Sequence, residues 1–193
     1  DQAVSSKECP LFVGRYLRGV QNRESPKWLK NRLIGIGLNP ISALVDITNY
    51  LTFDRARPLH VFDADKLSGG LTVRRSVEGE KFHALDDKIY ELNEGMIVIT
   101  DEKEIVSLGG IIGGMKSAVS DETKNVLLEA AYFDPISIAA TGRKLQINSD
   151  ARYRFERGVD PSFTLSGSHI ATKMILDLCC LLYTSPSPRD REK

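Results

Sequence analysis

The spacing of apolar residues changes twice along the chain, and this change restricts the fold more than any single motif does. Between about residues 25 and 53, and again after residue 134, most apolar side chains recur at helical spacing, whereas between residues 71 and 112 the period becomes two. Short runs of period two, separated by acidic turns, are typical of antiparallel strands. The sequence therefore predicts an α+β fold with helices at both ends of a strand-rich middle.

The individual elements follow from the same spacing. We expect a strand over 12–20, a buried strand over 125–133 and short strands over 71–74, 81–85, 88–92, 96–99 and 104–108. The first helix is expected to have Ser25 as its N-cap and Pro26 at its first helical position. Its buried face is predicted to comprise Trp28, Leu29, Leu33 and Ile36. Further helices are expected over 41–53, from Asp134-Pro135 to about residue 145, and over 161–178.

Composition excludes several classes of protein. With 193 residues the chain has room for one large domain or two small interleaved ones. No apolar run approaches the ~18 residues that cross a bilayer, so we expect no membrane partner. The three cysteines are too few for a disulfide framework or a zinc site. We therefore expect a reducing, cytoplasmic environment and no metal.

Both ends of the sequence are unusual. The chain begins at Asp1 rather than at a methionine, which indicates a piece of something longer. Residues 180–193 are rich in serine and proline, resemble a translated sequencing adapter, and are expected to be a disordered, non-native tail. A natural Ser/Pro tail is the alternative.

Basic residues gather in two places although the net charge is zero. The segment from Arg15 to Arg32 holds six cations and one anion, and the second cluster lies between Arg143 and Arg157. Two such patches could hold a phosphate backbone. Taken singly, runs of this kind are more often solvated faces.

Three local features carry possible chemistry, and each has a structural alternative. The segment 109–114 (GGIIGG) allows a ligand to approach the backbone, or forms a tight turn. His60 follows the helix-breaking Pro58 and is able to exchange a proton near neutral pH, or is structural. Glu129 lies in an apolar strand, where it faces either a buried partner or solvent. The charged segment 154–161 is interpreted as an ion-paired turn.

Six ordered segments together resemble one family. They are 44–50 (LVDITNY), 57–63 (RPLHVFD), 109–114 (GGIIGG), 126–135 (VLLEAAYFDP), 141–143 (TGR) and 149–161 (SDARYRFERGVDP). Over residues 8–179 the chain is similar to the third and fourth modules of the β subunit of bacterial phenylalanine–tRNA ligase. Each segment alone would be weak, but their common order is highly specific.

The resemblance implies a tRNA-binding and editing domain over 8–179, built of two interleaved modules. It implies a three-layer fold with a β-sandwich of unusual topology. The implied activity is hydrolysis of tyrosine wrongly attached to the phenylalanine tRNA. The implied partners are that tRNA and the α subunit of an α2β2 assembly. No cofactor is expected in this fragment, since ATP and magnesium belong to the complete enzyme.

The resemblance also implies a set of site residues. His60, Thr48 and Asn49 would position the terminal adenosine, the ester and a water. Glu129 would accept a hydrogen bond from the tyrosine hydroxyl. The remaining pocket residues would be Gly109, Gly110, Ser149 and Ala151. The residues implied for tRNA binding are Arg15, Arg18, Lys27, Lys30, Arg143 and Lys144. The chain departs from the family pattern at Gly109, often Ala; at Ala56-Arg57, usually Gly-Gln; and at Ser149, often Thr.

Physical chemistry fits this interpretation, but leaves a second one open. An apolar pocket rejects an added hydroxyl by only about 100-fold, so a second site that requires the hydroxyl adds selectivity. Glu129 would be satisfied by tyrosine and left unpaired by phenylalanine. The competing hypothesis is a non-catalytic RNA-binding or scaffolding module. The editing hypothesis predicts that Thr48, Asn49, His60, Gly110 and Glu129 converge on one cavity.

Overall fold

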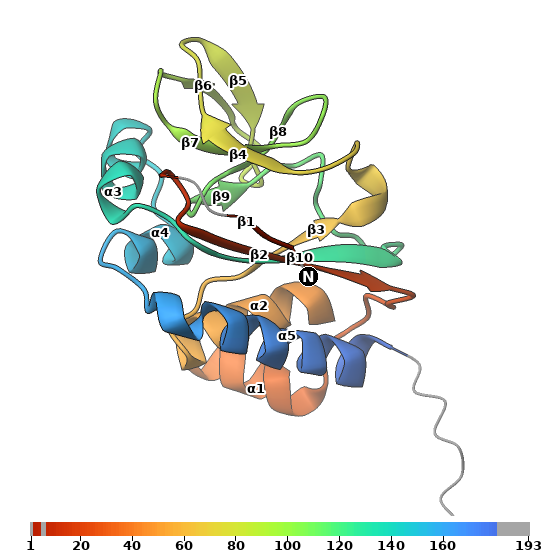
Figure 1. Ribbon diagram of the computed structural model, residues 1–193. Coiled ribbons are helices and arrows are strands. Elements are labelled where there is room, and N and C mark those ends of the chain that lie inside the picture. Colours follow the sequence, from red (N-terminus) through yellow and green to blue (C-terminus); the bar gives the residue numbers. More distant parts are fainter. Residues whose placement is uncertain (1, 5–6, 181–193) are drawn as a thin grey trace, which may run out of the picture.

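The computed structural model describes residues 2–4 and 7–180 and arranges them in three layers (Figure 1). A central sheet separates a layer of helices from a second, strand-rich layer. The predicted α+β class, with helices at both ends of a strand-rich middle, is confirmed. Of the predicted tail, residues 181–193 lie outside the described residues. Within the described part, no helix combines the length and the apolar character that crossing a membrane requires.

The central sheet brings together strands that are far apart in the sequence. Its order is β1 (Gln2–Val4), β2 (Leu11–Arg18), β10 (Asn125–Tyr132) and β3 (His60–Asp63), and every neighbouring pair is antiparallel. The sequence does not predict strand β3, because four residues after a proline carry too little periodicity. The uninterrupted register of β10 with both neighbours fixes which of its side chains face each layer.

Alternation along β10 supplies two hydrophobic cores. Val126 and Leu128 belong to the core beneath the helices, whereas Leu127 and Ala131 belong to the core beneath the strand-rich layer. Because successive side chains point to opposite faces, Glu129 lies on the face of Leu127 and Ala131. The carboxylate is thus directed between the two sheets.

Three helices cover the other face of the sheet (Figure 1): α1 (Lys27–Gly35), α2 (Ala43–Asp54) and α5 (Thr164–Cys179). Helix α2 contacts α1, α5 and β3, and α5 contacts β2 and β10. The predicted start of α1 is wrong by one position, since Pro26 is the N-cap residue. The Ser25 hydroxyl instead donates to Asp46 Oδ2 at 2.6 Å.

The predicted buried face of α1 is half right. Leu29 and Leu33 are 0% and 1% exposed, whereas Trp28 and Ile36 are 44% and 52% exposed. Trp28 packs edge-on against Tyr50 at the surface of the helical layer, with ring centroids 5.8 Å apart. The helix therefore buries a narrower stripe than its apolar content indicates.

The strand-rich layer is inserted between β3 and β10, which are neighbours in the central sheet. One sheet has the order β4 (Thr72–Arg75), β7 (Ile97–Thr100), β8 (Ile105–Leu108) and β9 (Ile112–Gly113). A separate hairpin pairs β5 (Glu80–His83) with β6 (Ile89–Leu92). A 3₁₀ turn, η1 (Ala64–Lys66), follows β3. The division of residues 8–179 into two interleaved modules, which the resemblance implies, stays a prediction.

Two shorter helices close one side of the molecule. Helix α3 (Pro135–Lys144) begins at Asp134, whose side chain accepts from Ser137 N, as predicted for its cap. Helix α4 (Asp150–Phe155) falls partly within the predicted charged turn, and its six residues are too few for a helical pattern to be visible. The last predicted helix divides into a 3₁₀ turn, η2 (Pro161–Phe163), and α5.

Candidate functional site

A pocket of about 80 Å³ lies where the edge of the central sheet meets the inserted layer and α4. Segments remote in the sequence form its wall: the loop before β3, strand β10, the glycine-rich loop and one face of α4. Its lining residues are Pro58, Leu59, His60, Ser107, Gly110, Ile111, Ile112, Gly113, Glu129, Ala151 and Phe155. Four predicted site residues, His60, Gly110, Glu129 and Ala151, therefore converge on one cavity.

His60 and Glu129 are direct partners in the register of β3 and β10. Side chains opposed in an antiparallel pair stand about 4.5–5.5 Å apart at Cβ and share one face of the sheet. The same register places Phe62 beside His60 on that face, and the two rings meet edge-on with centroids 4.5 Å apart. The pocket thus has an acid and an imidazole fixed on a rigid sheet.

Glu129 is buried, and no residue in the described part of the chain forms an ion pair with it. The residue is 6% exposed, and its Oε2 is enclosed with no hydrogen-bond partner among the described residues. Burial raises the pKa of this carboxyl to about 8, because the charged form loses its hydration. At neutral pH the pocket therefore presents mainly the protonated acid, which has one donor and one acceptor to offer a ligand.

His60 carries the opposite perturbation. The residue is only partly buried, yet its Nε2 is enclosed and has no hydrogen-bond partner within the described part of the chain. Desolvation lowers the pKa of the imidazole to about 4. The ring is therefore neutral at physiological pH, and as a weak base it is better suited to orienting a water or an ester than to removing a proton.

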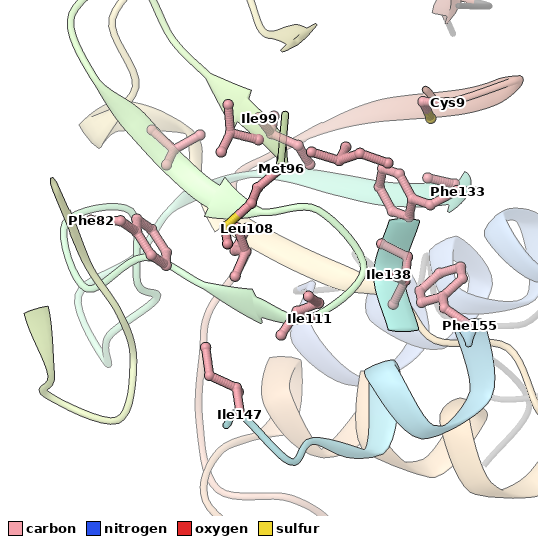
Figure 2. Packing of buried hydrophobic residues seen from close by; sticks show 14 of the residues in the cluster. Cys9, Phe82, Met96, Ile99, Leu108, Ile111, Phe133, Ile138, Ile147 and Phe155 are labelled. Atoms are coloured by element: carbon pink, nitrogen blue, oxygen red, sulfur yellow. The ribbon is translucent and has the colours of Figure 1, made fainter. Parts of the chain in front are cut away.

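The glycine-rich loop owes its path to close packing. Gly110 has φ of +68°, and a Cβ at this position would meet Phe133, Ile138 and Phe155 at 2.9–3.2 Å. Figure 2 shows these three side chains lying together in the core of the strand-rich half. Both the backbone angle and the packing thus require glycine.

Gly113 supports the imidazole directly, a role that the sequence reasoning missed. A Cβ on Gly113 would lie 2.4 Å from Cε1 and 2.6 Å from Nε2 of His60. Any side chain here would displace the ring. The density of glycines in the segment was the available signal, but it did not distinguish Gly113 from its neighbours.

The remaining predicted pocket residues lie outside the lining. Thr48 and Asn49 belong to α2 in the helical layer, and the Thr48 hydroxyl donates to Val45 O at 2.8 Å. A side chain on Gly109 would point at Ile97 and Phe133 in the core rather than into the pocket. Direct contact of these residues with a ligand stays a prediction.

Ser149 acts on the pocket wall from behind it. Its hydroxyl donates to Ile111 O at 2.6 Å and accepts from Arg152 N at 3.1 Å. The first bond holds the glycine-rich loop, and the second caps α4. Ser149 therefore joins two elements of the pocket, and Ala151 stands two residues further along the same helix.

The residues predicted to bind tRNA lie at the surface away from the lining. Arg18 and Lys27 are exposed, Lys30 pairs with Glu24, and Arg15 is half-buried. Arg143 and Lys144 are exposed at the C-terminal end of α3. Among the described residues, no three His, Cys, Asp or Glu side chains gather in a way that could hold a metal ion.

Comparison with known proteins identifies the family. Residues 8–180 match the B3/4 domain, and the chain belongs to this family. It is 58% identical over 179 residues to the phenylalanine–tRNA ligase β subunit of Cereibacter sphaeroides, covering 93% of this chain and 22% of that protein. The β subunit of Ruegeria pomeroyi is 58% identical over 171 residues, covering 89% of this chain and 21% of that protein. The chain thus spans about a fifth of the length of these relatives.

One solved structure resembles this chain more distantly. It is an N-terminal fragment of the phenylalanyl-tRNA synthetase β subunit from Pyrococcus horikoshii, with a TM-score of 0.48 and 16% sequence identity. The alignment covers 68% of this chain and 44% of that one.

Proposed function

We propose that this chain is the editing domain of a phenylalanine–tRNA ligase β subunit, and that it hydrolyses tyrosine from wrongly charged phenylalanine tRNA. The observation that carries the proposal is the buried, unpaired Oε2 of Glu129 in a pocket that also holds His60. An enclosed polar atom without a partner is costly, and a ligand that satisfies it is favoured over one that does not.

The phenolic hydroxyl of tyrosine fits this requirement. It can donate to the carboxyl of Glu129 or accept from its proton, whereas the ring of phenylalanine would cover the carboxyl and leave it unsatisfied. An unsatisfied buried polar group costs about 1–3 kcal/mol, which adds to the discrimination already made during charging. Ala151 and the glycine-rich loop leave space beside the acid.

Hydrolysis in this pocket would depend on positioning. The ester of an aminoacyl-tRNA needs a held water and stabilisation of the developing oxyanion. A neutral His60 can orient that water through its free Nε2, and the terminal hydroxyl of the tRNA is near the ester in any bound pose. His60→Ala is therefore expected to slow the release of tyrosine.

The wider assignments follow from the same proposal. The macromolecular partners would be the phenylalanine tRNA and the α subunit in an α2β2 assembly, in the cytoplasm. ATP and magnesium would serve the charging reaction elsewhere in the complete enzyme, and no cofactor is assigned to this pocket.

The test compares hydrolysis of tyrosyl- and phenylalanyl-tRNA by the 193-residue chain. The wild type should release tyrosine faster than phenylalanine, and Glu129→Ala should remove that preference. Glu129→Gln should retain more of it, because an amide also offers one acceptor and a donor. Glu91→Ala, at an exposed position on β6, is the matched control. Binding of the tRNA with no hydrolysis of either ester would favour the scaffolding alternative instead.

A further inference from the structure

A second cavity, of about 230 Å³, lies beside the pocket and is lined by arginines. Arg55 and Arg57 come from the loop before β3, whereas Arg154 and Arg157 come from α4 and the segment after it. Asp160 is the one acidic residue of its lining. We call the cavity the arginine cleft. Such an excess of guanidinium groups in a concave site is suited to a phosphate group.

Arg57 is the strongest sign that the arginine cleft takes an anion. Its side chain is 1% exposed, and it donates to Ala131 O at 2.8 Å and to Asp160 O. Its Nε is enclosed without a hydrogen-bond partner, and no carboxylate of the described residues forms an ion pair with it. Burial lowers the pKa of Arg57, and the nearby Asp160 charge opposes that shift only in part. The buried cation bonds only to carbonyls and is therefore incompletely compensated.

The other arginines are partly compensated. Arg55 pairs with Asp54 at 2.9 Å, Arg154 with Asp150 at 3.4 Å, and Arg157 with Glu156 at 2.7 Å. These three acids lie outside the lining of the arginine cleft. The Asp160 carboxylate is itself engaged, since it accepts from the backbone and the hydroxyl of Ser162 at 2.8 and 2.7 Å.

An aromatic side chain in the arginine cleft favours a nucleic-acid phosphate over a free one. Tyr153 is 57% exposed, and the Arg157 guanidinium lies 3.8 Å from the centre of its ring. Stacked Arg and Tyr side chains form a platform on which an unpaired base can stack. The arginine cleft therefore offers a phosphate site and a base site together.

The arginine cleft and the pocket share two walls. Arg57, in the loop before β3, is three residues from His60 at the start of that strand. Their Cα atoms are therefore at most about 11 Å apart. On α4, Ala151 and Phe155 face the pocket, whereas Tyr153 and Arg154 line the arginine cleft. A nucleotide whose ester reached His60 would bring its nearest phosphates to this cavity.

We propose that the arginine cleft binds a backbone phosphate in the single-stranded 3′ end of an RNA whose terminal ester enters the pocket. This inference rests on the proposed function for the identity of the RNA. The exposed Arg55 and Arg157 would bond to the phosphate, and the buried charge of Arg57 would attract it through space. Tyr153 would stack on an adjacent base.

The test measures binding of uncharged phenylalanine tRNA to the 193-residue chain over a range of salt concentrations. Arg57→Gln, and separately the exposed pair Arg55→Gln with Arg157→Gln, should weaken binding. Each should reduce the slope of log affinity against log salt by about 0.7 for every phosphate that the variant no longer neutralises. Lys81→Gln, at an exposed position on β5, should change neither quantity.

Tyr153→Ala should weaken binding of the tRNA while leaving competition by inorganic phosphate unchanged. The inference would be overturned if both arginine variants kept the tRNA affinity of the wild type and its salt dependence. It would also be overturned if inorganic phosphate bound saturably while those variants left tRNA binding unchanged. The proposed function is judged separately. If the wild type released no tyrosine but the arginine variants bound tRNA more weakly, editing would fail and the arginine cleft would stand.

Discussion

His60 and Glu129 face each other across β3 and β10, and burial shifts their pKa values in opposite directions. Both side chains are therefore held in their neutral forms near pH 7. An ion pair between them would instead lower the pKa of Glu129 and raise the pKa of His60. A neutral acid beside a neutral imidazole is a pair of uncommitted hydrogen-bonding groups. Such a pair suits recognition of a hydroxyl and an ester better than it suits strong acid–base catalysis.

The stability of the chain should report the state of Glu129. Its pKa is about 8 in the folded chain and near 4.5 in the unfolded one, so the folded state holds the proton that the unfolded state releases. The contribution is fully present below pH 4.5 and is lost as pH rises through 8. The free energy of unfolding of wild type minus that of Glu129→Gln should fall by up to about 1.4 kcal/mol per pH unit in this window. Urea denaturation at several pH values measures it.

The contribution of His60 to the free energy of unfolding should depend on pH in the opposite direction. Its pKa is about 4 in the folded chain and 6.5 for a freely solvated imidazole, so the unfolded chain binds the proton first as pH falls. Its contribution is present above pH 6.5 and is lost as pH falls through 4. The unfolding free energy of wild type minus that of His60→Asn should therefore decrease from pH 6.5 to 4. An increase instead would mean that His60 and Glu129 form an ion pair when folded.

Gly113→Ala should damage the proposed activity more than stability. The added methyl group would meet the His60 ring, while the backbone of Gly113 has no left-handed φ and accepts alanine. Because small misplacements of a positioning group are costly, release of tyrosine should slow by about 10- to 100-fold. Gly70→Ala is the control, since a Cβ there meets nothing within 4 Å. If both variants released tyrosine at the same rate, Gly113 would not be needed to position the imidazole.

The sequence predicted the periodic elements, including the four-residue strands of the inserted layer, but not strand β3 or helix α4. Strand β10 and helices α2 and α3 carry enough apolar residues for their period to be read. Strand β3 and helix α4 have four and six residues, and their formation depends on neighbours that are distant in the sequence. Period alone could not decide whether Glu129 faces inward, because that depends on what covers its face of the sheet.

The backbone conformation of the loop before β3 could be predicted only in part from the sequence. Ala56 has φ of +49°, the left-handed region that glycine prefers. This angle gives a physical reason for the glycine that the resemblance leads us to expect there. The replacement of Gln by Arg at position 57 was visible as a departure from the family. Its complete burial against α5 was not, because a charged residue in a loop is ordinarily exposed.

Ser149→Ala should loosen the wall of the pocket. The substitution removes the cap of α4 and leaves Ile111 O without its donor, so the free energy of unfolding should fall by about 1–2 kcal/mol. Ser149→Thr keeps the hydroxyl and should remain close to wild type. Thermal unfolding of the three proteins measures the difference, and tyrosine release should fall with Ser149→Ala because Ile111 lines the pocket. If the Ser149→Ala protein were as stable as the Ser149→Thr protein, the hydrogen bond between Ser149 and Ile111 would not contribute to stability.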